Sequence, residues 1–331
     1  MSTAVPERDP ADLVASLAEA YLDSRCLHVI AYLGVCDVVT DAPIRATEIA
    51  DEVGADAGAL GRVMRHLASL GVFEMVDGAF RHNEASRLLT TGHPSGLLPL
   101  TRLLGLPICW DSLKVLEDTV RTARPGAELL DPDGLFAYLE AHPAESTTYH
   151  DGMTAMTVRR IERIVPHYDF TRFGTVADIG GGRGHLLRAV LDQAPRATGI
   201  LFDRPPALAA AEGDDRIAVQ PGDFFVGPLP TADCYLLSNI VHDWGDDEAI
   251  AILRGLRAAS PPDSTLLLFE FVVPDDAESF EASDIDVFML ALVTGRERTL
   301  AEYEQLLTAA GWAFVAAHPT PSQTIIEASP R

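Results

Sequence analysis

The sequence predicts an α/β fold with a parallel sheet, preceded by a mainly helical domain. From about Phe173 onward, apolar runs of strand length alternate with helical stretches, which is typical of βαβ units. The first hundred residues instead place apolar side chains at helical spacing, interrupted by glycines. A chain of 331 residues is long enough for about two domains. We expect a helical domain over 1–100, a helical linker over 101–168 and the α/β domain over 169–331.

The N-terminal region has the outline of a winged helix. Residues 46–54 and 58–71 indicate two short helices that each end at a glycine, and residues 72–81 indicate a hairpin. This order of elements is typical of DNA-binding domains and also of packing and dimerisation modules. Between residues 45 and 91, seven acidic residues face five basic ones, whereas a DNA-binding surface should be basic. The slightly negative charge of this region therefore favours a dimerisation module over a DNA-binding domain.

The charge of the whole chain argues against a polyanionic partner. Acidic residues outnumber basic ones by 49 to 25, and both halves of the chain are acidic, so nucleic acid or an anionic membrane would be repelled. The N-terminus lacks the apolar core of a signal peptide, and no apolar run approaches the length of about 18 residues that a membrane span needs. The four cysteines are scattered without a CxxC pair, which fits a reducing compartment. We expect a cytoplasmic protein that binds small molecules.

The most specific local motif is Asp178-Ile-Gly-Gly-Gly-Arg-Gly, between a predicted strand over 176–179 and a predicted helix over 185–193. Glycines such as Gly180 and Gly182 permit a tight turn and the close approach of a nucleotide-like ligand. The spacing differs from the GxGxxG of nicotinamide-binding proteins. An acid before the glycines suits a cofactor that has a cationic amino group and no pyrophosphate. The motif therefore predicts S-adenosylmethionine; a purely structural glycine turn is the alternative.

Polar residues stand at the ends of the next predicted strands. Asp203 follows the glycine motif at close to the offset of about 20 residues at which an acid binds ribose hydroxyls. Asp223 and Phe224 offer a carboxylate and an aromatic face to an adenine, and Ser238 and Glu270 mark the two strands that follow. Ligands of open α/β sheets bind outside the carboxyl ends of the strands, so these groups should converge on one crevice. Ordinary turn residues are the alternative for any one of them.

His242 is the candidate general base. A phenol with a pKa near 10 attacks a sulfonium methyl group well only as the phenolate, and histidine, which titrates near 6.5, is suited to take the proton. A neighbouring carboxylate would fix the tautomer of the ring, and both Glu270 and Glu297 are candidates. A simple capping role is the alternative. The acidic turn over 243–248 is explained by the start of the following helix, so we expect no metal.

Six motifs between residues 178 and 299 resemble those of a known family, and with the winged-helix outline before them the resemblance spans nearly the whole chain. In order, they are Asp178-Ile-Gly-Gly-Gly-Arg-Gly, Leu201-Phe-Asp-Arg-Pro, Pro221-Gly-Asp-Phe-Phe, Leu237-Ser-Asn-Ile-Val-His-Asp-Trp, Phe269-Glu-Phe-Val-Val-Pro and Gly295-Arg-Glu-Arg-Thr. The chain resembles the S-adenosylmethionine-dependent O-methyltransferases, in the class shared by plant phenolic and bacterial natural-product enzymes. The resemblance implies a Rossmann-like class I methyltransferase domain, a winged-helix dimerisation domain and a homodimer.

The resemblance also implies residue roles. It gives Gly180 to the methionine portion of the cofactor, Asp203 to the ribose, and Asp223 with Phe224 to the adenine; we add Asp178, Gly182 and Ser238 to the cofactor site. His242 matches the catalytic base, and Glu270 and Glu297 match its two flanking acids. The positions that match the methyl-acceptor pocket are Met153, Met156, Asp243 and Met289. Core packing is the alternative for the three methionines, because methionine fills irregular apolar gaps.

The sequence thus predicts a metal-independent, homodimeric O-methyltransferase. Its acceptor would be a hydroxyl group of an aromatic or polyketide-like small molecule, as in natural-product biosynthesis. Two alternatives remain. One is a relative with altered chemistry, an N-methyltransferase or a hydroxylase, although the hydroxylating relatives tend to lose the histidine. The other is a winged-helix regulator, which the acidic charge disfavours.

Overall fold

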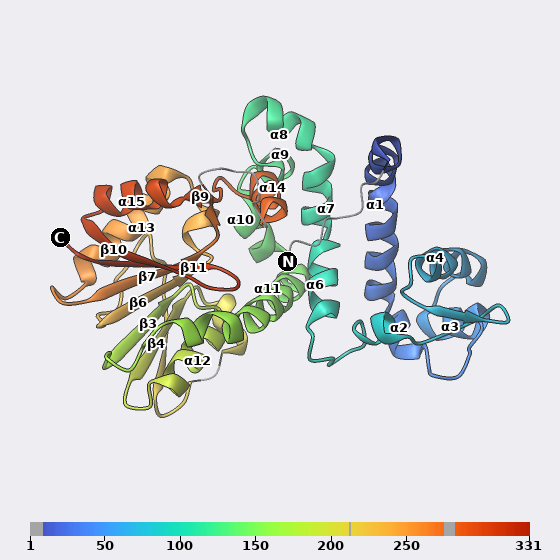
Figure 1. Cartoon of the computed structure of the whole chain (residues 1–331), viewed down its shortest axis with the longest axis horizontal. Helices are drawn as coiled ribbons and strands as arrows, with labels where there is room; N and C mark the ends of the chain where they lie inside the picture. The colour runs from blue at the N-terminus through green and yellow to red at the C-terminus, as the bar shows by residue number, and fades with distance from the viewer. Residues whose placement is uncertain (1–8, 212, 275–281) are drawn as a thin grey trace. The chain divides into compact units, whose positions relative to one another are not determined.

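A computed structural model describes residues 9–211, 213–274 and 282–331 (Figure 1). The chain forms two compact units that divide between Leu106 and Pro107. Each unit has its own buried apolar core. Within the described ranges, no helix combines the length and the apolar character needed to cross a membrane.

The N-terminal unit is helical apart from one short hairpin. Its longest helix is capped at the start by Asp9, whose carboxylate accepts the N–H of Ala11 at 2.8 Å, and is followed by Gly34 in the left-handed conformation. Ile49, Met64 and Phe80 are fully buried together in its core. The elements are α1 (Pro10–Leu33), α2 (Val35–Val38), α3 (Ala46–Val53), α4 (Ala57–Ser69), β1 (Glu74–Val76), β2 (Ala79–Arg81), α5 (Glu84–Arg87) and α6 (Leu97–Leu104). Two helices followed by a hairpin match the predicted winged-helix outline.

The second unit begins with a run of helices. These are α7 (Pro107–Lys114), α8 (Leu116–Thr122), α9 (Gly126–Leu130), α10 (Gly134–Ala141), α11 (Pro143–Ile164) and the 3-10 turn η1 (Val165–His167). α11 starts with a proline, which is favoured in the first turn because its missing N–H would have had no partner there. Most of the segment expected to be a linker therefore belongs to the same compact unit as the sheet.

A seven-stranded sheet forms the centre of this unit. Its strands are β3 (Thr175–Ile179), β4 (Thr198–Asp203), β5 (Ile217–Pro221), β6 (Cys234–Ser238), β7 (Thr265–Glu270), β10 (Trp312–Pro319) and β11 (Thr324–Pro330). They lie in the order β10-β11-β7-β6-β3-β4-β5. β11 pairs antiparallel with both of its neighbours, and the other strand pairs are parallel. The predicted fold class, a helical domain followed by an α/β domain, is confirmed.

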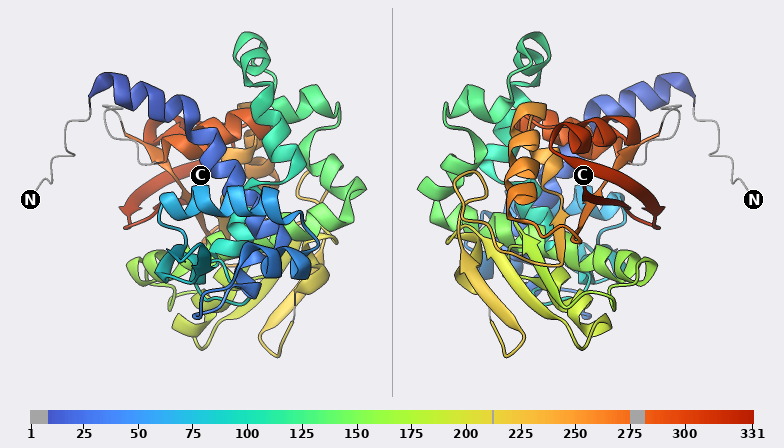
Figure 2. Two further views of the ribbon diagram at one scale, coloured as in Figure 1. Left: turned by 90° about the vertical axis from the view of Figure 1, so that its right-hand side faces the viewer. Right: turned by 90° about the vertical axis from the view of Figure 1, so that its left-hand side faces the viewer.

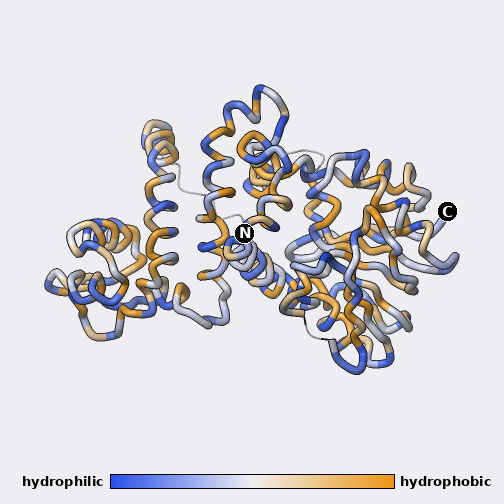
Figure 3. Tube along the Cα trace, turned by 180° about the vertical axis from the view of Figure 1, so that it is seen from behind, coloured by the Kyte–Doolittle hydropathy of each residue, from blue (hydrophilic) through white to orange (hydrophobic). Residues whose placement is uncertain are grey.

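Helices cover both faces of the sheet (Figures 1 and 2). Successive residues of a strand point to opposite faces, and accordingly Val176 packs in one core with Leu187, whereas Ala177 packs in the other with Leu253. The central strands β3, β6 and β7 are buried on both sides and are nearly continuous apolar runs (Figure 3). The covering helices include α12 (His185–Gln193), α13 (Asp246–Ala259) and α15 (Leu300–Ala309), whereas α14 (Ser283–Leu292) packs against α7, α8 and α9.

The five consecutive parallel strands place their carboxyl ends at one edge of the sheet. The glycine-rich segment follows β3, and the 3-10 turn η3 (Val241–Asp243) follows β6. Just beyond β7, the short strand β8 (Val272–Val273) pairs in parallel with β9 (Arg298–Thr299). This pairing returns the chain after α14 to the edge of the sheet at which the strands end.

Candidate active site

A cavity of about 310 Å³ lies at this edge, within the second unit. Its wall is formed by the loops after β3, β4, β5 and β6, together with α10 and α11. The parallel order of the strands brings these loops together although they are far apart in the sequence. The sequence-predicted residues that line the cavity are Met153, Gly180, Gly182, Asp203, Asp223, Phe224, Ser238 and Asp243.

The glycine-rich loop has the backbone geometry of a ligand cradle. Gly180 and Gly182 have φ angles of +73° and +55°, a region that other residues rarely adopt. At Gly182 a Cβ atom would meet no described atom within 4 Å, so the loop faces open space there. Asp203 holds the loop, because its Oδ2 accepts the N–H of Gly182 at 2.8 Å. Burial raises the pKa of the Asp203 carboxyl, although this hydrogen bond opposes the rise.

Asp178 lies behind the loop rather than in the cavity wall. It is 1% exposed, and its Oδ2 has no hydrogen-bond partner among the described residues. A Cβ atom on Gly181 would come within 2.5 Å of that oxygen, so the loop packs directly on the carboxyl group. Burial and the nearby charge of Asp203 raise the pKa of Asp178 to about 7. In this position Asp178 supports the loop.

An aromatic cluster forms one side of the cavity. Trp244 stacks on Phe136 of α10, with ring centroids 5.6 Å apart and ring planes 23° from parallel. Phe224 and Phe225 meet the indole edge to face at 5.9 and 4.7 Å. Such stacked and edge-on pairs are the favourable arrangements of aromatic rings. The cluster gives the cavity a flat apolar surface beside Asp223.

His242 lies in a buried cluster of acids next to the cavity. The residue is 4% exposed, and the Nδ1 of its ring is 2.7 Å from Oε1 of Glu297. Glu270 is farther away, with 3.9 Å between its Oε2 and Nδ1, and its Oε1 accepts the N–H of Val241 at 2.9 Å. Glu297 is therefore the acid that orients the ring, and Glu270 fixes the backbone of η3. On the other side, Nε2 is 3.5 Å from Oδ1 of Asp243, which lines the cavity.

The acids determine the protonation of this cluster. Burial alone would lower the pKa of His242, but Glu270, Asp243 and Glu297 outweigh burial and raise it to about 9. Burial also raises the pKa of Glu270 to about 8 and that of Asp243 to about 6, while the charge of His242 opposes both rises. The cluster therefore stabilises an imidazolium ion.

The same residues form a set with metal-ligand chemistry. Ligand atoms of His242, Glu270 and Glu297 lie within 4.8 Å of one another. However, Nδ1 of the ring already makes a short hydrogen bond to Glu297, and Glu270 accepts a backbone N–H. These side chains thus already take part in hydrogen bonds without a metal ion. Metal independence of the reaction stays a prediction.

Family comparisons agree with this geometry. A family model for the O-methyltransferase domain matches residues 114–313, and a model for the O-methyltransferase dimerisation domain matches residues 15–92. The phenazine O-methyltransferase PhzM of Lysobacter antibioticus is 36% identical over 96% of this chain and 96% of its own length. The chain belongs to the O-methyltransferase family. The predicted family, enzyme class and cofactor class are confirmed.

Other relatives of this O-methyltransferase differ in the acceptors that their names state. A solved structure of NcsB1, an O-methyltransferase from neocarzinostatin biosynthesis, holds S-adenosyl-L-homocysteine and 1,4-dihydroxy-2-naphthoic acid. It is 30% identical, covers 94% of this chain and 96% of its own, and has a TM-score of 0.84. The 8-amino-8-demethylriboflavin N,N-dimethyltransferase of Streptomyces davaonensis is 31% identical over 88% of this chain and 87% of its own.

Some sequence-predicted residues of the O-methyltransferase are not part of the cavity wall. Met156 and Met289 are half-buried on α11 and α14, and neither is among the described residues that line the cavity. Along α11, Met153 lines the cavity, but Met156, three residues on, is turned about 60° around the helix axis. His242, Glu270 and Glu297 lie behind the wall, in contact with it through Asp243.

Other lining residues were missed by the sequence reasoning. Phe225 and Trp244 stand inside the quoted motifs, beside residues that were singled out, so the motifs contained a signal for them. Phe136, Tyr149 and Thr157 lie in α10 and α11, where the sequence showed helices but no motif. Two ion pairs tie these helices to the cofactor loops: Arg183 to Asp151 at 2.7 Å and Arg204 to Glu140 at 2.6 Å.

Proposed function

We propose that this O-methyltransferase transfers a methyl group from S-adenosylmethionine to a hydroxyl group of an aromatic or polyketide-like small molecule. The observation that carries the proposal is the buried His242–Glu297 hydrogen bond behind a cavity that also contains a glycine-rich loop. A base and a nucleotide-type cradle at one cavity are the two parts that hydroxyl methylation needs.

The residues of the cavity fit the cofactor. The open space before Gly182 admits a ligand close to the backbone. Asp203 and Asp223 stand at the wall as partners for ribose and adenine groups, and the aromatic cluster offers the adenine a flat surface. Bound there, S-adenosylmethionine would supply an electrophilic methyl group on a sulfonium centre.

The His242 cluster is suited to accept the proton of the acceptor hydroxyl. Glu297 holds the Nδ1 side of the ring, which leaves Nε2 on the side of Asp243 and the cavity. The pKa of about 9 lies close to that of a phenol, near 10, so proton transfer between the two groups is nearly balanced. Glu297, which is hydrogen-bonded to the ring, then stabilises the imidazolium ion that forms. We assign His242 as the base and Glu297 and Glu270 as residues that position it.

The acceptor side of the cavity favours a flat, partly apolar molecule. Met153, Tyr149 and Thr154 of α11 line the cavity, a thioether, a phenol and an alcohol side chain. Such a mixed surface, with few polar groups among apolar ones, is usual for small-molecule sites. The naphthoic acid held by the relative from neocarzinostatin biosynthesis supports an aromatic acceptor.

An amine acceptor is the second candidate, because one relative is named as an N,N-dimethyltransferase. A neutral amine attacks a methyl group without losing a proton first, so it would not need His242. The buried base therefore favours oxygen as the nucleophile. Hydroxylation by an altered relative would also leave the base without a use.

We further propose that the N-terminal unit forms a homodimer. Val14, Leu17 and Tyr21 of α1 are each at least 60% exposed, and apolar side chains in such numbers on one helix are typical of interaction surfaces. The match to the dimerisation domain supports a two-fold pairing. Sedimentation should show a dimer at micromolar concentration. A fully active monomer would contradict this assignment.

A direct assay tests the function. The protein is incubated with isotopically labelled S-adenosylmethionine and a panel of phenols, each matched to the aniline of the same ring system. Phenols should gain one CH₂ in mass while the anilines remain unchanged. Transfer to anilines alone would replace the O-methylation proposal, and products that gain an oxygen atom would replace methylation altogether.

A further inference from the structure

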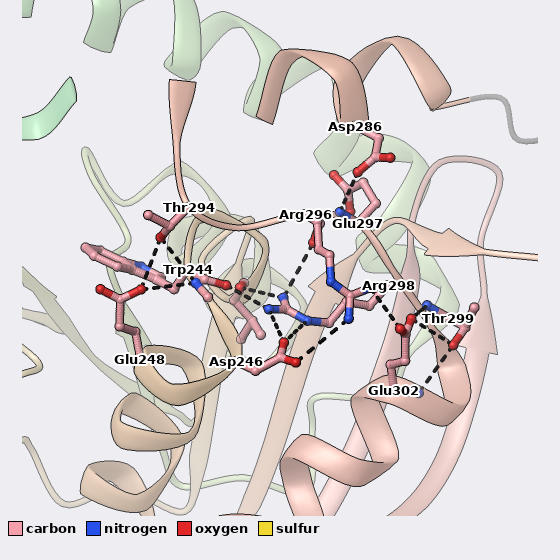
Figure 4. A network of polar contacts seen from close by, with 12 residues as sticks. Trp244, Asp246, Glu248, Asp286, Thr294, Arg296, Glu297, Arg298, Thr299 and Glu302 are labelled. Carbon is pink, nitrogen blue, oxygen red and sulfur yellow. Dashed lines mark hydrogen bonds and ion pairs between the residues drawn. The ribbon is translucent and has the colours of Figure 1, made fainter. Parts of the chain in front are cut away.

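A buried arginine holds the turn on which His242 lies. Arg298 is 1% exposed, in β9. Its guanidinium group donates from Nη1 to the carbonyl oxygen of Val241 at 3.0 Å and from Nη2 to that of Trp244 at 2.7 Å. Nε and Nη2 also donate to Oδ1 of Asp246 at 3.1 and 2.8 Å (Figure 4).

The two carbonyl groups bracket the catalytic turn. Val241 is the first residue of η3, and Trp244 directly follows its last. In a turn this short the carbonyl of Val241 accepts only a long backbone hydrogen bond, from the N–H of Trp244 at 3.4 Å, so the guanidinium group adds a closer donor. The guanidinium group is planar and has five N–H donors in a fixed arrangement, so it can serve both carbonyls and one carboxylate at once. A lysine has one nitrogen and cannot span them.

The chain couples this contact to the orientation of the ring. Glu297, directly before Arg298, makes the 2.7 Å contact to Nδ1 of His242. Consecutive residues of one segment thus fix the imidazole ring and the backbone that bears it. Pairing of Arg298 with Val272 in the β8–β9 ladder ties this segment to the chain two residues after Glu270, which holds the N–H of Val241.

We infer that Arg298 is a positioning residue for methyl transfer, fixing the Val241–Trp244 turn so that His242 and Asp243 keep their place at the cavity. This inference rests on the proposed function. Arg298 is not among the described residues that line the cavity, so it acts through the turn and not on the acceptor. A buried cation is costly unless it is paired and hydrogen-bonded, and the contacts of Arg298 with the two carbonyl groups and with Asp246 meet that requirement.

The test compares Arg298→Lys and Arg298→Met with Arg296→Met as the matched control. Arg296 is two residues away and also pairs with Asp246, at 3.8 Å, but its side chain is 47% exposed and, within the described residues, its guanidinium group donates to Glu302 at 2.8 Å and not to a carbonyl of the turn. Both Arg298 variants should lose turnover by about 10²-fold, because a small displacement of a positioned group has an effect of this size. Cofactor affinity measured by calorimetry should change by less than about twofold, and the control should keep wild-type turnover.

A second readout is independent of catalysis. The titration of His242 is followed by NMR of labelled imidazole rings, with His242→Ala used to assign the signal. In the Arg298 variants the His242–Glu297 contact loosens, so the pKa of the ring should fall from its raised value towards 6.5. If the wild-type protein methylates no acceptor, the proposed function fails, while this titration still tests the placement of the turn.

A structural role alone would give a different result. In that case the Arg298 variants would melt at a lower temperature, but kcat per folded molecule and the titration of His242 would match the wild type. That result overturns the inference. Should both variants fail to fold, Asp246→Asn decides, because it weakens the same anchor from a half-exposed position. It should shift the titration in the same direction, and an unshifted titration would overturn the inference.

Discussion

The raised pKa of His242 makes a quantitative prediction about the pH dependence of turnover. With a pKa of about 9, roughly one ring in a hundred is neutral at pH 7 and about half are neutral at pH 9. If the neutral ring is the base, kcat/KM should rise by roughly 50-fold between these two values. A histidine with its ordinary pKa near 6.5 would give a rise of less than about twofold.

The assay measures initial rates from pH 6 to 10 with labelled cofactor and two acceptors whose phenols differ in acidity. The acid limb should stay near pH 9 for both acceptors, because it belongs to the enzyme and not to the phenol. His242→Ala should lower turnover at pH 7 by about 10²–10⁴-fold, and its remaining rate should follow ionisation of the phenol. Cofactor affinity should be preserved, since the ring lies behind the cavity wall.

His318→Ala is the matched control, because His318 of β10 also pairs with a glutamate, Glu327 at 3.0 Å, but is not among the described residues that line the cavity. It should retain the wild-type profile. A wild-type rate that is flat above pH 7.5 would refute the assignment of the acid limb of the pH profile to deprotonation of the His242 imidazolium. So would a His242→Ala variant with normal turnover at pH 7.

Three further predictions concern the cofactor, stability and metal. Asp203→Ala should weaken S-adenosylmethionine binding by about 1.5–3 kcal/mol in calorimetry, and unchanged affinity in a folded variant would remove Asp203 from the cofactor site. Glu270, whose folded pKa of about 8 lies above the usual 4.5, keeps its proton where the unfolded chain loses it, so stability should fall as pH rises from about 4.5 to 8. Glu270→Gln should flatten that slope in denaturant unfolding, and an unaltered slope would show that Glu270 ionises normally. Removal of divalent metal by a chelator should leave turnover unchanged; lost activity that returns with one added metal would show that the His242, Glu270 and Glu297 set binds it.

The backbone plan of the site was predictable because it depends on strand order. Asp203 and Ser238 end parallel strands and Asp223 follows the end of another, and parallel strands bring their carboxyl ends to one edge whatever the loops do. The glycine motif was predictable for a related reason, since its φ angles are restricted to glycine in practice.

Side-chain relationships were less predictable because they depend on long-range packing. The choice between Glu270 and Glu297 as partner of His242 follows from the pairing of β8 with β9, two strands of two residues each that have no periodic signal. Asp178 precedes the glycines in the motif, yet its carboxyl group points beneath the loop. Phe136 joins the cavity only because α10 places it on Trp244.

The ion pairs between the helices and the cofactor loops bear on how acceptor preference can be redesigned. Asp151 and Glu140 belong to the helices that line the acceptor side, and their partners Arg183 and Arg204 each follow a residue of the cofactor cradle. A chimaera that imports α10 and α11 from a relative therefore exchanges half of each pair. Grafts that keep an acid at both positions preserve the cradle, whereas grafts that lose one leave an arginine without its carboxylate beside Gly182 or Asp203. A change of acceptor selectivity made by exchanging these helices therefore also changes cofactor binding.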